Sequence, residues 1–247
     1  MDLQLTGKAF LVTGGSRGLG LATARALRAE GADVVIAARS SDRLAAAAQE
    51  LDCTGVVADL GDPASSDRLV AATLEAYGGI DGALVSVGGP PSGPALGLSD
   101  EQWHDAFGSI FLGTVRLCRA VVAALPERGG SLALVLSTSV KTPIAGLAAS
   151  NGLRPGLAML AKTMADELGP RGIRVNGLLP GRIDTDRVRE LDGLDPAVRR
   201  QAAGAIPLGR YGTPEEFGRV AAFLLSPAAS FVSGSMVPVD GGALRAL

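Results

Sequence analysis

A glycine-rich turn near the start of the chain is the first stretch whose residue types could do chemistry. Gly14, Gly18 and Gly20 lie between a largely apolar run, Lys8 to Val12, and a segment of helical composition, Leu21 to Glu30. A diphosphate reaches the free N–H groups of a helix start only where no Cβ stands in the way, and the helix dipole favours the anion. The spacing differs from the G-x-G-x-x-G fingerprint, so the stretch alone also fits an ordinary glycine turn. We predict a dinucleotide cradle lined by Gly14, Ser16, Arg17, Gly18, Leu19 and Gly20.

The composition excludes several classes of function. The 247 residues suit one α/β domain spanning 1–247, and the net charge of −2, with both signs well mixed, does not favour binding to nucleic acid or to an acidic membrane. Cys53, Cys118 and the single His104 are too scattered for a structural metal site or a disulfide. The N-terminus lacks a signal pattern, and no uncharged apolar stretch reaches membrane-spanning length. We expect a cytoplasmic protein.

The elements that must position the cradle alternate between strands and helices. Strands are expected at Val34–Ala38, Thr54–Ala58, Ala83–Val87, Ser131–Ser137, Ile173–Leu178 and Met236–Val239, and helices at Ser41–Leu51, Pro63–Tyr77, Ser99–Leu125, Ser150–Leu168 and Pro214–Leu225. The strands are mostly apolar without alternation, which is typical of a parallel sheet covered by helices on both faces. We therefore predict a doubly wound Rossmann fold of the α/β class.

Two long connections adjoin the expected site. A Gly/Pro-rich loop covers Gly88–Pro94, and a charged segment covers Pro180–Leu208, a length more typical of a functional lid than of a simple connection. Arg182 and Arg187 of this segment could meet an anionic substrate or remain solvated, because acidic neighbours offset them. His104, at the start of a long helix, is expected at the surface.

The end of the second strand predicts which dinucleotide binds. A carboxylate there would accept hydrogen bonds from a free ribose 2′-hydroxyl, but the residue present is Arg39. Arg39 and Arg17 could pair with a 2′-phosphate through their guanidinium forks, which favours NADP(H) over NAD(H), although Arg39 could also be a solvated loop residue. Asp59, after the third strand, either meets the adenine amino group or serves a turn together with Asp62.

The chain resembles the short-chain dehydrogenase/reductase family over nearly its whole length. The matching motifs are Thr13-Gly14-x-x-x-Gly18-x-Gly20, Asp59-Leu60, Ile173-Arg174-Val175-Asn176, Pro180-Gly181-x-x-x-Thr185 and Val239-Asp240-Gly241-Gly242. The resemblance implies a seven-stranded parallel sheet, NADP(H) or NAD(H) binding, a small-molecule substrate and a homo-oligomer, commonly a tetramer. It implies that Ile183 and Thr185 contact the nicotinamide carboxamide. The other residues assigned to the cofactor are Arg39, Asp59, Leu60, Gly88, Pro180 and Gly181.

The chain departs from the family at the catalytic residues. The family combines Asn and Ser with a Y-x-x-x-K pair, and its Ser stands thirteen positions before the Tyr. In this chain the serine falls on Ser137, the tyrosine position on Ser150, the lysine position on Arg154 and the asparagine position on Ile110. We therefore take Ser137, Ser150 and Arg154 as the candidate catalytic residues.

These substitutions change what acid–base chemistry is possible. A serine hydroxyl is a far weaker acid than a phenol and reaches less far, and an arginine does not release its proton in a protein. Loss of a positioned general acid costs about 10² to 10⁴ in rate, whereas proximity of bound reactants supplies about 7 to 11 kcal/mol. Hydride transfer to an acceptor that needs no strong acid therefore stays possible.

Pro155 affects the helix that carries these residues. Proline is tolerated in the first turn of a helix and disfavoured inside it. We predict that the helix starts one turn late, with Ser150 or Asn151 near its cap, or that it bends there. Ser150 is then either a catalytic residue or a cap whose hydroxyl serves the backbone.

Three functions compete on this basis. The first is an NADP(H)-dependent oxidoreductase with a remodelled site that acts on a small carbonyl or conjugated substrate. The second is a non-redox dehydratase, isomerase or cyclase on the same scaffold, and the third is a catalytically silent NADP(H)-binding protein. The family resemblance favours the first.

Overall fold

A computed structural model describes residues 1–193 and 195–246. Seven parallel strands form one sheet in the order β3-β2-β1-β4-β5-β6-β7, which confirms the predicted doubly wound α/β fold. The strands are β1 (Ala9–Thr13), β2 (Asp33–Ala38), β3 (Thr54–Val57), β4 (Gly82–Val85), β5 (Gly130–Val135), β6 (Ile173–Pro180) and β7 (Met236–Val239). The order reverses between β1 and β4, and in such sheets ligands bind outside the carboxyl ends of the strands at this point.

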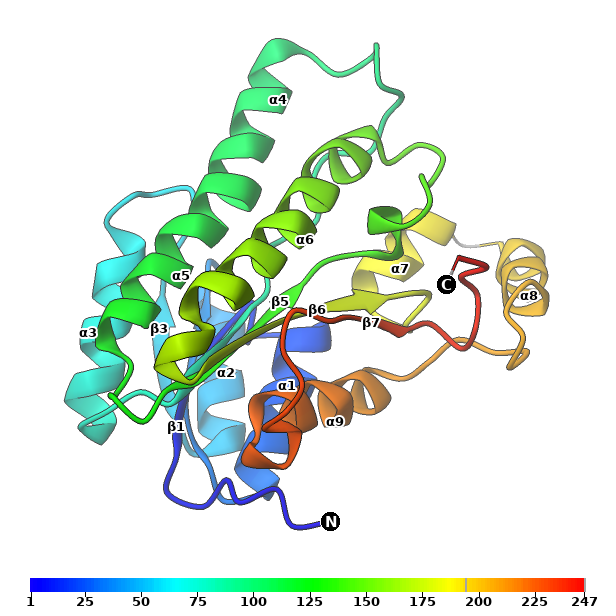
Figure 1. Ribbon diagram of the computed structural model, residues 1–247. Helices are drawn as coiled ribbons and strands as arrows, with labels where there is room; N and C mark the ends of the chain where they lie inside the picture. The colour runs from blue at the N-terminus through cyan, green and yellow to red at the C-terminus, as the bar shows by residue number, and fades with distance from the viewer. Residues whose placement is uncertain (194, 247) are drawn as a thin grey trace.

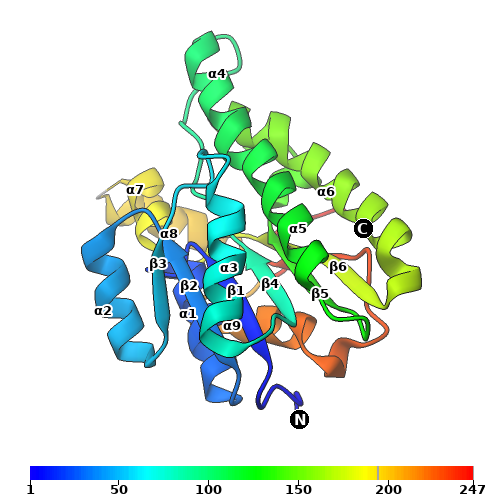
Figure 2. The ribbon, with the colours of Figure 1, turned by 90° about the vertical axis from the view of Figure 1, so that its left-hand side faces the viewer.

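Helices cover both faces of the sheet (Figures 1 and 2). One face carries α3 (Ser65–Tyr77), α5 (Gly113–Ala124) and α6 (Ala148–Leu168), and the other carries α1 (Gly18–Ala29), α2 (Ser41–Leu51) and α9 (Pro214–Leu225). The core is divided accordingly into two apolar clusters, one on each side of the sheet. Buried residues alternate between these clusters along β1, where Leu11 belongs to the first, and Phe10 and Val12 to the second. The central strands are therefore apolar throughout because both of their faces are covered.

The long helix after β4 is a composite. It consists of α4 (Asp100–Ala106), a π-helical segment (Phe107–Leu112) and α5. Ser99 starts it with a capping box, because its hydroxyl accepts from the Gln102 amide and the Gln102 side chain accepts from the Ser99 amide. Residues Asp100–Ala124 are long and apolar enough to span a membrane by length and composition alone. Here this helix is a core element, since α5 buries Leu117, Cys118 and Val121 in the first cluster.

The charged segment after β6 contains two short helices, α7 (Asp186–Asp192) and α8 (Pro196–Gly204). Leu194, between them, lies outside the described residues. Both helices stand beyond the carboxyl edge of the sheet (Figure 1). They rest on a polar network in which Asp184 accepts from Arg189 at 2.9 Å and from Arg199 at 3.0 Å, while Tyr211 donates to Asp192 at 2.6 Å. The segment is thus a structured lid rather than an irregular loop.

Candidate active site

The glycine turn between β1 and α1 has the geometry of a phosphate cradle. A Cβ on Gly20 would lie 2.3 Å from the Gly14 carbonyl oxygen, and Gly14 and Gly18 both have positive φ, at +64° and +55°. Helix α1 begins at Gly18 without a side-chain cap and without an acidic residue in its first turn. The first N–H groups of α1 are therefore not claimed by a capping side chain, which suits an anion.

The loop after β6, which carries further predicted cofactor residues, lies against this turn. A Cβ on Gly18 would lie 3.5 Å from the Thr185 methyl group, so the loop after β6 closes over the glycines. Thr185 also caps α7 by accepting from the Val188 amide at 3.4 Å. Ile183 is 3% exposed and is held beside Gly212 by a β-bridge, and the Gly181 amide donates to Val239 at 3.0 Å. The motif from Pro180 to Thr185 is therefore a rigid frame at the carboxyl end of β6.

The edge of the site beyond β2 is basic. Arg39 is exposed at the end of β2, and its Nη2 would lie 3.6 Å from a Cβ on Gly88. Arg17 forms an exposed ion pair with Asp186 at 3.4 Å. Asp59 accepts from the Gly61 amide at 2.9 Å, which is the turn role expected as one alternative, and Leu60 packs against Gly113. The end of β2 therefore offers the exposed guanidinium of Arg39 and no carboxylate in residues 37–40.

The three candidate catalytic residues lie around the carboxyl end of β5. Ser137 follows the strand and caps a short 3₁₀ turn, Thr138–Val140, by accepting from the Ser139 amide at 3.1 Å. The Ser150 hydroxyl lies 3.1 Å from the Ser139 hydroxyl, and both side chains are buried. Ser139 was not predicted from the sequence, because only the fold brings it opposite Ser150.

Arg154 is a buried cation. It is 6% exposed, and its Nη1 donates to the Val135 carbonyl oxygen at 2.7 Å. In the described part of the chain it forms no ion pair with a carboxylate. Burial lowers the pKa of Arg154 to about 10, so the guanidinium is still charged at neutral pH.

Helix α6 differs from the prediction. It begins at Ala148, before Ser150, and continues to Leu168 with Pro155 inside it. The predicted late start and the capping role of Ser150 are therefore wrong. Asn151 supports the early start from the first turn, because its side chain accepts from the Ile144 amide at 3.0 Å and donates to the Ile144 carbonyl at 2.8 Å. Proline removes only the hydrogen bond to the Asn151 carbonyl, and the surrounding contacts compensate for this loss.

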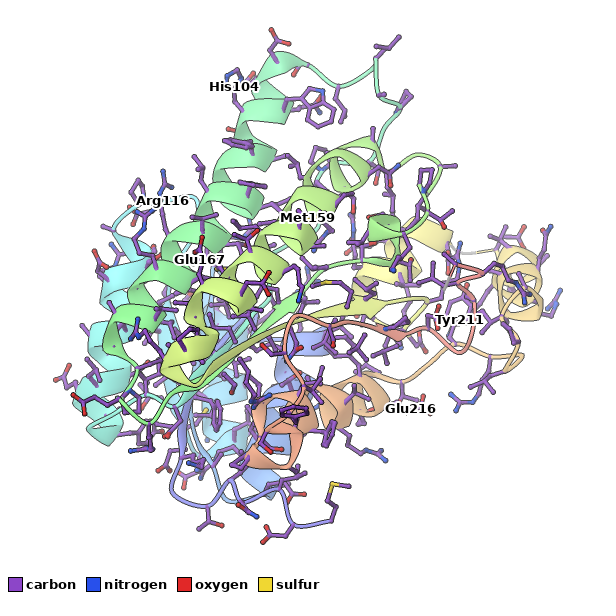
Figure 3. The ribbon with its side chains drawn as sticks, viewed as in Figure 1. His104, Arg116, Met159, Glu167, Tyr211 and Glu216 are labelled. Atoms are coloured by element: carbon purple, nitrogen blue, oxygen red, sulfur yellow. The ribbon has the colours of Figure 1, made fainter. Side chains whose placement is uncertain are left out.

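The other sequence candidates lie apart from these residues. Ile110 is buried within the π-helical segment, so an apolar side chain occupies the expected asparagine position. The His104 ring contacts the Asp100 carbonyl oxygen at 2.7 Å on exposed α4 (Figure 3). Arg187 of α7 donates to the Pro90 carbonyl oxygen at 3.0 Å, so the lid is fastened to the Gly88–Pro94 loop across the site.

An apolar pocket of about 420 Å³ adjoins the first turn of α6. Its walls are the loop Gly93–Ala95 and the loop Pro143–Gly146. The two loops are joined because the Gly93 amide donates to the Gly146 carbonyl at 2.7 Å and the Ala148 amide donates to the Gly93 carbonyl at 3.2 Å. The pocket walls therefore offer mainly apolar groups to a ligand.

Comparisons with known proteins agree with this geometry. A family model described as enoyl-(acyl carrier protein) reductase matches residues 14–243. The dehydrogenase/reductase SDR family member 4 of Oryctolagus cuniculus is 36% identical over 97% of this chain and 94% of its own length. The L-sorbose reductase of Gluconobacter frateurii, solved with NADPH and L-sorbose, superposes with a TM-score of 0.93 at 31% identity and 100% coverage of both chains. A short-chain oxidoreductase of Pseudomonas aeruginosa, described as containing an atypical catalytic center, gives 0.91 at 29% identity, covering 98% of this chain and 99% of its own.

These matches span the same strands, glycine turn and carboxyl-edge loops from which the site is built. The chain belongs to the short-chain dehydrogenase/reductase family.

Proposed function

We propose that this protein is an NADP(H)-dependent oxidoreductase with a remodelled active site, acting on a small carbonyl or conjugated substrate. The observation that carries the proposal is the glycine cradle at the uncapped start of α1, beside an exposed Arg39 and without a carboxylate at the end of β2. The related L-sorbose reductase, solved with NADPH, supports the choice of cofactor.

The chain's own residues would divide the work as follows. Gly14, Ser16, Arg17, Gly18, Leu19 and Gly20 would hold the diphosphate, Arg39 and Gly88 the adenosine ribose phosphate, Asp59 and Leu60 the adenine, and Pro180, Gly181, Ile183 and Thr185 the nicotinamide end. NADPH supplies a hydride when it is bound. Ser137, Ser150 and Arg154 would then bind and polarise the acceptor, and the lid fastened by Arg187 would exclude water.

The missing tyrosine and lysine do not exclude an oxidoreductase. A related short-chain oxidoreductase is itself described as having an atypical catalytic center. Positioning of two bound reactants lowers the activation barrier by about 7 to 11 kcal/mol. Loss of a general acid raises the barrier by only about 3 to 5.5 kcal/mol. Hydride transfer is therefore compatible with the residues present.

Fluorescence titration with NADPH and NADH, followed by hydride transfer to a panel of carbonyl and conjugated compounds, tests the proposal. We expect tighter binding of NADPH and turnover with at least one acceptor. Failure to bind NADPH at millimolar concentration would contradict it. Introducing Ser150→Tyr together with Arg154→Lys should increase reduction of simple ketones, since it restores an acid at the end of β5.

A second candidate is a catalytically silent NADP(H)-binding protein. One observation favours it: the hydroxyl of Ser150 contacts Ser139, and one Arg154 nitrogen contacts Val135, so both groups already have protein partners. Tight NADPH binding without turnover by either the wild type or the Tyr/Lys double variant would support this function over the first.

Assembly and location are part of the proposal. Large apolar side chains are exposed on the faces of the long helices, with Met159 of α6 at 70% and Phe107 at 42% (Figure 3). Such surfaces favour a homo-oligomer, which we propose to be a tetramer or dimer in the cytoplasm. Size-exclusion chromatography with light scattering measures the assembly.

A further inference from the structure

All of the described tyrosine, histidine and lysine side chains except Lys141 are engaged away from the end of β5. The Tyr77 hydroxyl donates to the Val34 carbonyl at 3.1 Å, and the Tyr211 hydroxyl donates to Asp192 in the lid network (Figure 3). His104 is on exposed α4, Lys8 and Lys162 pair with Asp81 and Asp166, and Lys141, directly after the turn Thr138–Val140, is exposed. The buried polar groups next to this turn are therefore the hydroxyl groups of Ser139 and Ser150, which are very weak acids, and one cation, Arg154.

Arg154 has N–H donors that are not used in hydrogen bonds with other described residues of the protein. A guanidinium carries five N–H donors, and Arg154 uses one nitrogen on the Val135 carbonyl. A charge that is 94% buried without a carboxylate partner is costly to a folded protein unless an anion or strong acceptor meets it. The buried part of the site is thus arranged to meet negative charge on a ligand, and its hydroxyl groups are too weakly acidic to neutralise that charge.

The kind of negative charge depends on where a hydride is added. Addition to the carbon of an isolated carbonyl produces an alkoxide, a strong base that must take up a proton at once. Addition to the β-carbon of a conjugated carbonyl compound produces an enolate, which is a much weaker base because oxygen and the α-carbon share the charge. A fixed cation stabilises an enolate without transferring a proton to it.

We propose that the substrate is an α,β-unsaturated carbonyl compound and that Arg154 stabilises the enolate oxygen formed from it; this rests on the NADP(H)-dependent function proposed above. The hydride that NADPH would supply forms the new C–H bond at the β-carbon as the C=C electron pair moves toward the carbonyl, which leaves NADP⁺. Water then delivers a proton to the α-carbon, its hydroxide is released to solvent, and the product is the saturated carbonyl compound.

The pocket beside α6 determines the rest of the substrate. Asn151 uses its amide on both backbone groups of Ile144, and the backbone groups of Gly93 pair with Gly146 and Ala148. These polar groups are therefore satisfied within the protein, and Pro94, Pro143 and Ile144 line the space. Asn151 precedes Arg154 by about one helical turn. The substrate accordingly joins an apolar body to its conjugated carbonyl group.

Isotope placement tests the site of hydride addition. NADPH carrying deuterium at the transferred position is supplied with cyclic and acyclic enones and with the matching saturated ketones. We expect deuterium at the β-carbon of a saturated ketone product and at least a tenfold preference for the enone. Deuterium at the carbonyl carbon, or no transfer to any enone by a chain that binds NADPH, overturns the inference. Failure to bind NADPH instead contradicts the proposed function.

A second measurement tests Arg154 without turnover. 4-Nitrophenol, whose ionised form absorbs in the visible range, mimics the enolate oxygen in the complex with NADP⁺. We expect at least a tenfold increase in its acid ionisation constant in the wild type, and a loss of this increase in Arg154→Gln. Arg171→Gln is the matched control, because Arg171 is exposed and also donates to a backbone carbonyl, that of Val122.

The outcomes of this titration are decisive. An ionisation curve equal to that in solution, or the same increase in Arg154→Gln as in the wild type, overturns the inference. Arg154→Lys keeps the charge and should keep most of the increase, so it replaces the glutamine variant if that variant does not fold. A folded lysine variant without the increase also contradicts a role for the charge.

Discussion

Gly20 shows how one missing side chain creates the cofactor cradle. A Cβ at this position would lie 2.3 Å from the Gly14 carbonyl oxygen, within the backbone of the turn itself. We expect Gly20→Ala to lower the free energy of unfolding by about 1 to 3 kcal/mol, as overpacking does, and to abolish NADPH binding. Urea denaturation and fluorescence titration measure the two effects.

Gly169→Ala is the matched control for that variant. Gly169 has a right-handed conformation with φ of −51° and has no atoms within 4 Å of an added Cβ. The control should keep wild-type binding and stability. Equal effects of the two substitutions on stability and on NADPH binding would show that the close approach of Gly20 to Gly14 is not the cause of the losses.

Arg39 is the residue that should distinguish the two dinucleotides. It is exposed, so its interaction with a 2′-phosphate is a solvent-screened, charge-assisted contact. We expect Arg39→Ala to weaken NADPH binding about tenfold, which is about 1.4 kcal/mol, and to leave NADH binding nearly unchanged. Arg128→Ala serves as the control, because Arg128 lies at the opposite edge of the sheet. It pairs with Asp81, whose carboxylate also accepts from the amide of Ala9 at the amino end of β1. Parallel losses for both dinucleotides would contradict a phosphate contact.

Among the elements, α7 is joined to the loop on the opposite side of the site by Arg187. Arg187 donates to the Pro90 carbonyl at 3.0 Å and to the Ser92 hydroxyl at 3.3 Å. We expect Arg187→Ala to raise amide hydrogen exchange in Asp186–Asp192 several-fold, because the helix loses its contact with the opposite loop. Arg200→Ala, an exposed site on α8, should leave exchange in α7 as it is in the wild type. An unchanged exchange rate in the Arg187 variant would mean that the network around Asp184 and the ion pair between Arg17 and Asp186 hold the lid without this contact.

Helix α6 shows where sequence reasoning fails. Local preference predicts that Pro155 delays or bends the helix. The sequence does not reveal that the Asn151 side chain bonds to both backbone groups of Ile144 or that Arg154 donates to the carbonyl of Val135 in β5. These contacts join residues that are distant in space until the chain folds. Tertiary contacts at both ends of this turn outweigh the local cost of the proline, about 3 kcal/mol or more.

At the scale of the whole molecule, the lid makes stability depend on pH. Hydrogen bonds from Arg189 and Arg199 lower the pKa of Asp184 to about 2, below its usual value of 3.8. A carboxyl with a lowered folded-state pKa contributes stability above its unfolded pKa, and this contribution is lost as the pH falls from about 4 toward 2. We expect Asp184→Asn to reduce the pH dependence of the unfolding free energy in this window, measured by urea titration at each pH. An unchanged slope would contradict the ion pairs.

The sheet could be predicted from the sequence, whereas the site could be predicted only in part. Strands such as β1 and β4 could be predicted because each is buried on both faces and is therefore apolar throughout. The glycine turn could be predicted because its backbone conformation requires glycine. Ser139, which meets Ser150 at 3.1 Å, and the contact of Arg187 with Pro90 depend on loops whose paths follow no periodic pattern. Residue spacing predicts which of the family's catalytic residues are replaced, and the fold shows which side chains lie near the replacements.

The π-helical segment at Phe107–Leu112 has a consequence for how this protein can change. A π-turn holds one more residue than an α-turn, so the segment accommodates an extra residue while the faces of α4 and α5 on either side of it keep their register. In regular α-helical winding the same extra residue would rotate α4 by about 100° relative to α5 and turn Trp103 away from α6, where it packs within 3.4 Å of the Cβ position of Gly152. A one-residue deletion in this segment should therefore leave Trp103 against α6, whereas a one-residue deletion within α5 would rotate the two parts of the long helix relative to one another.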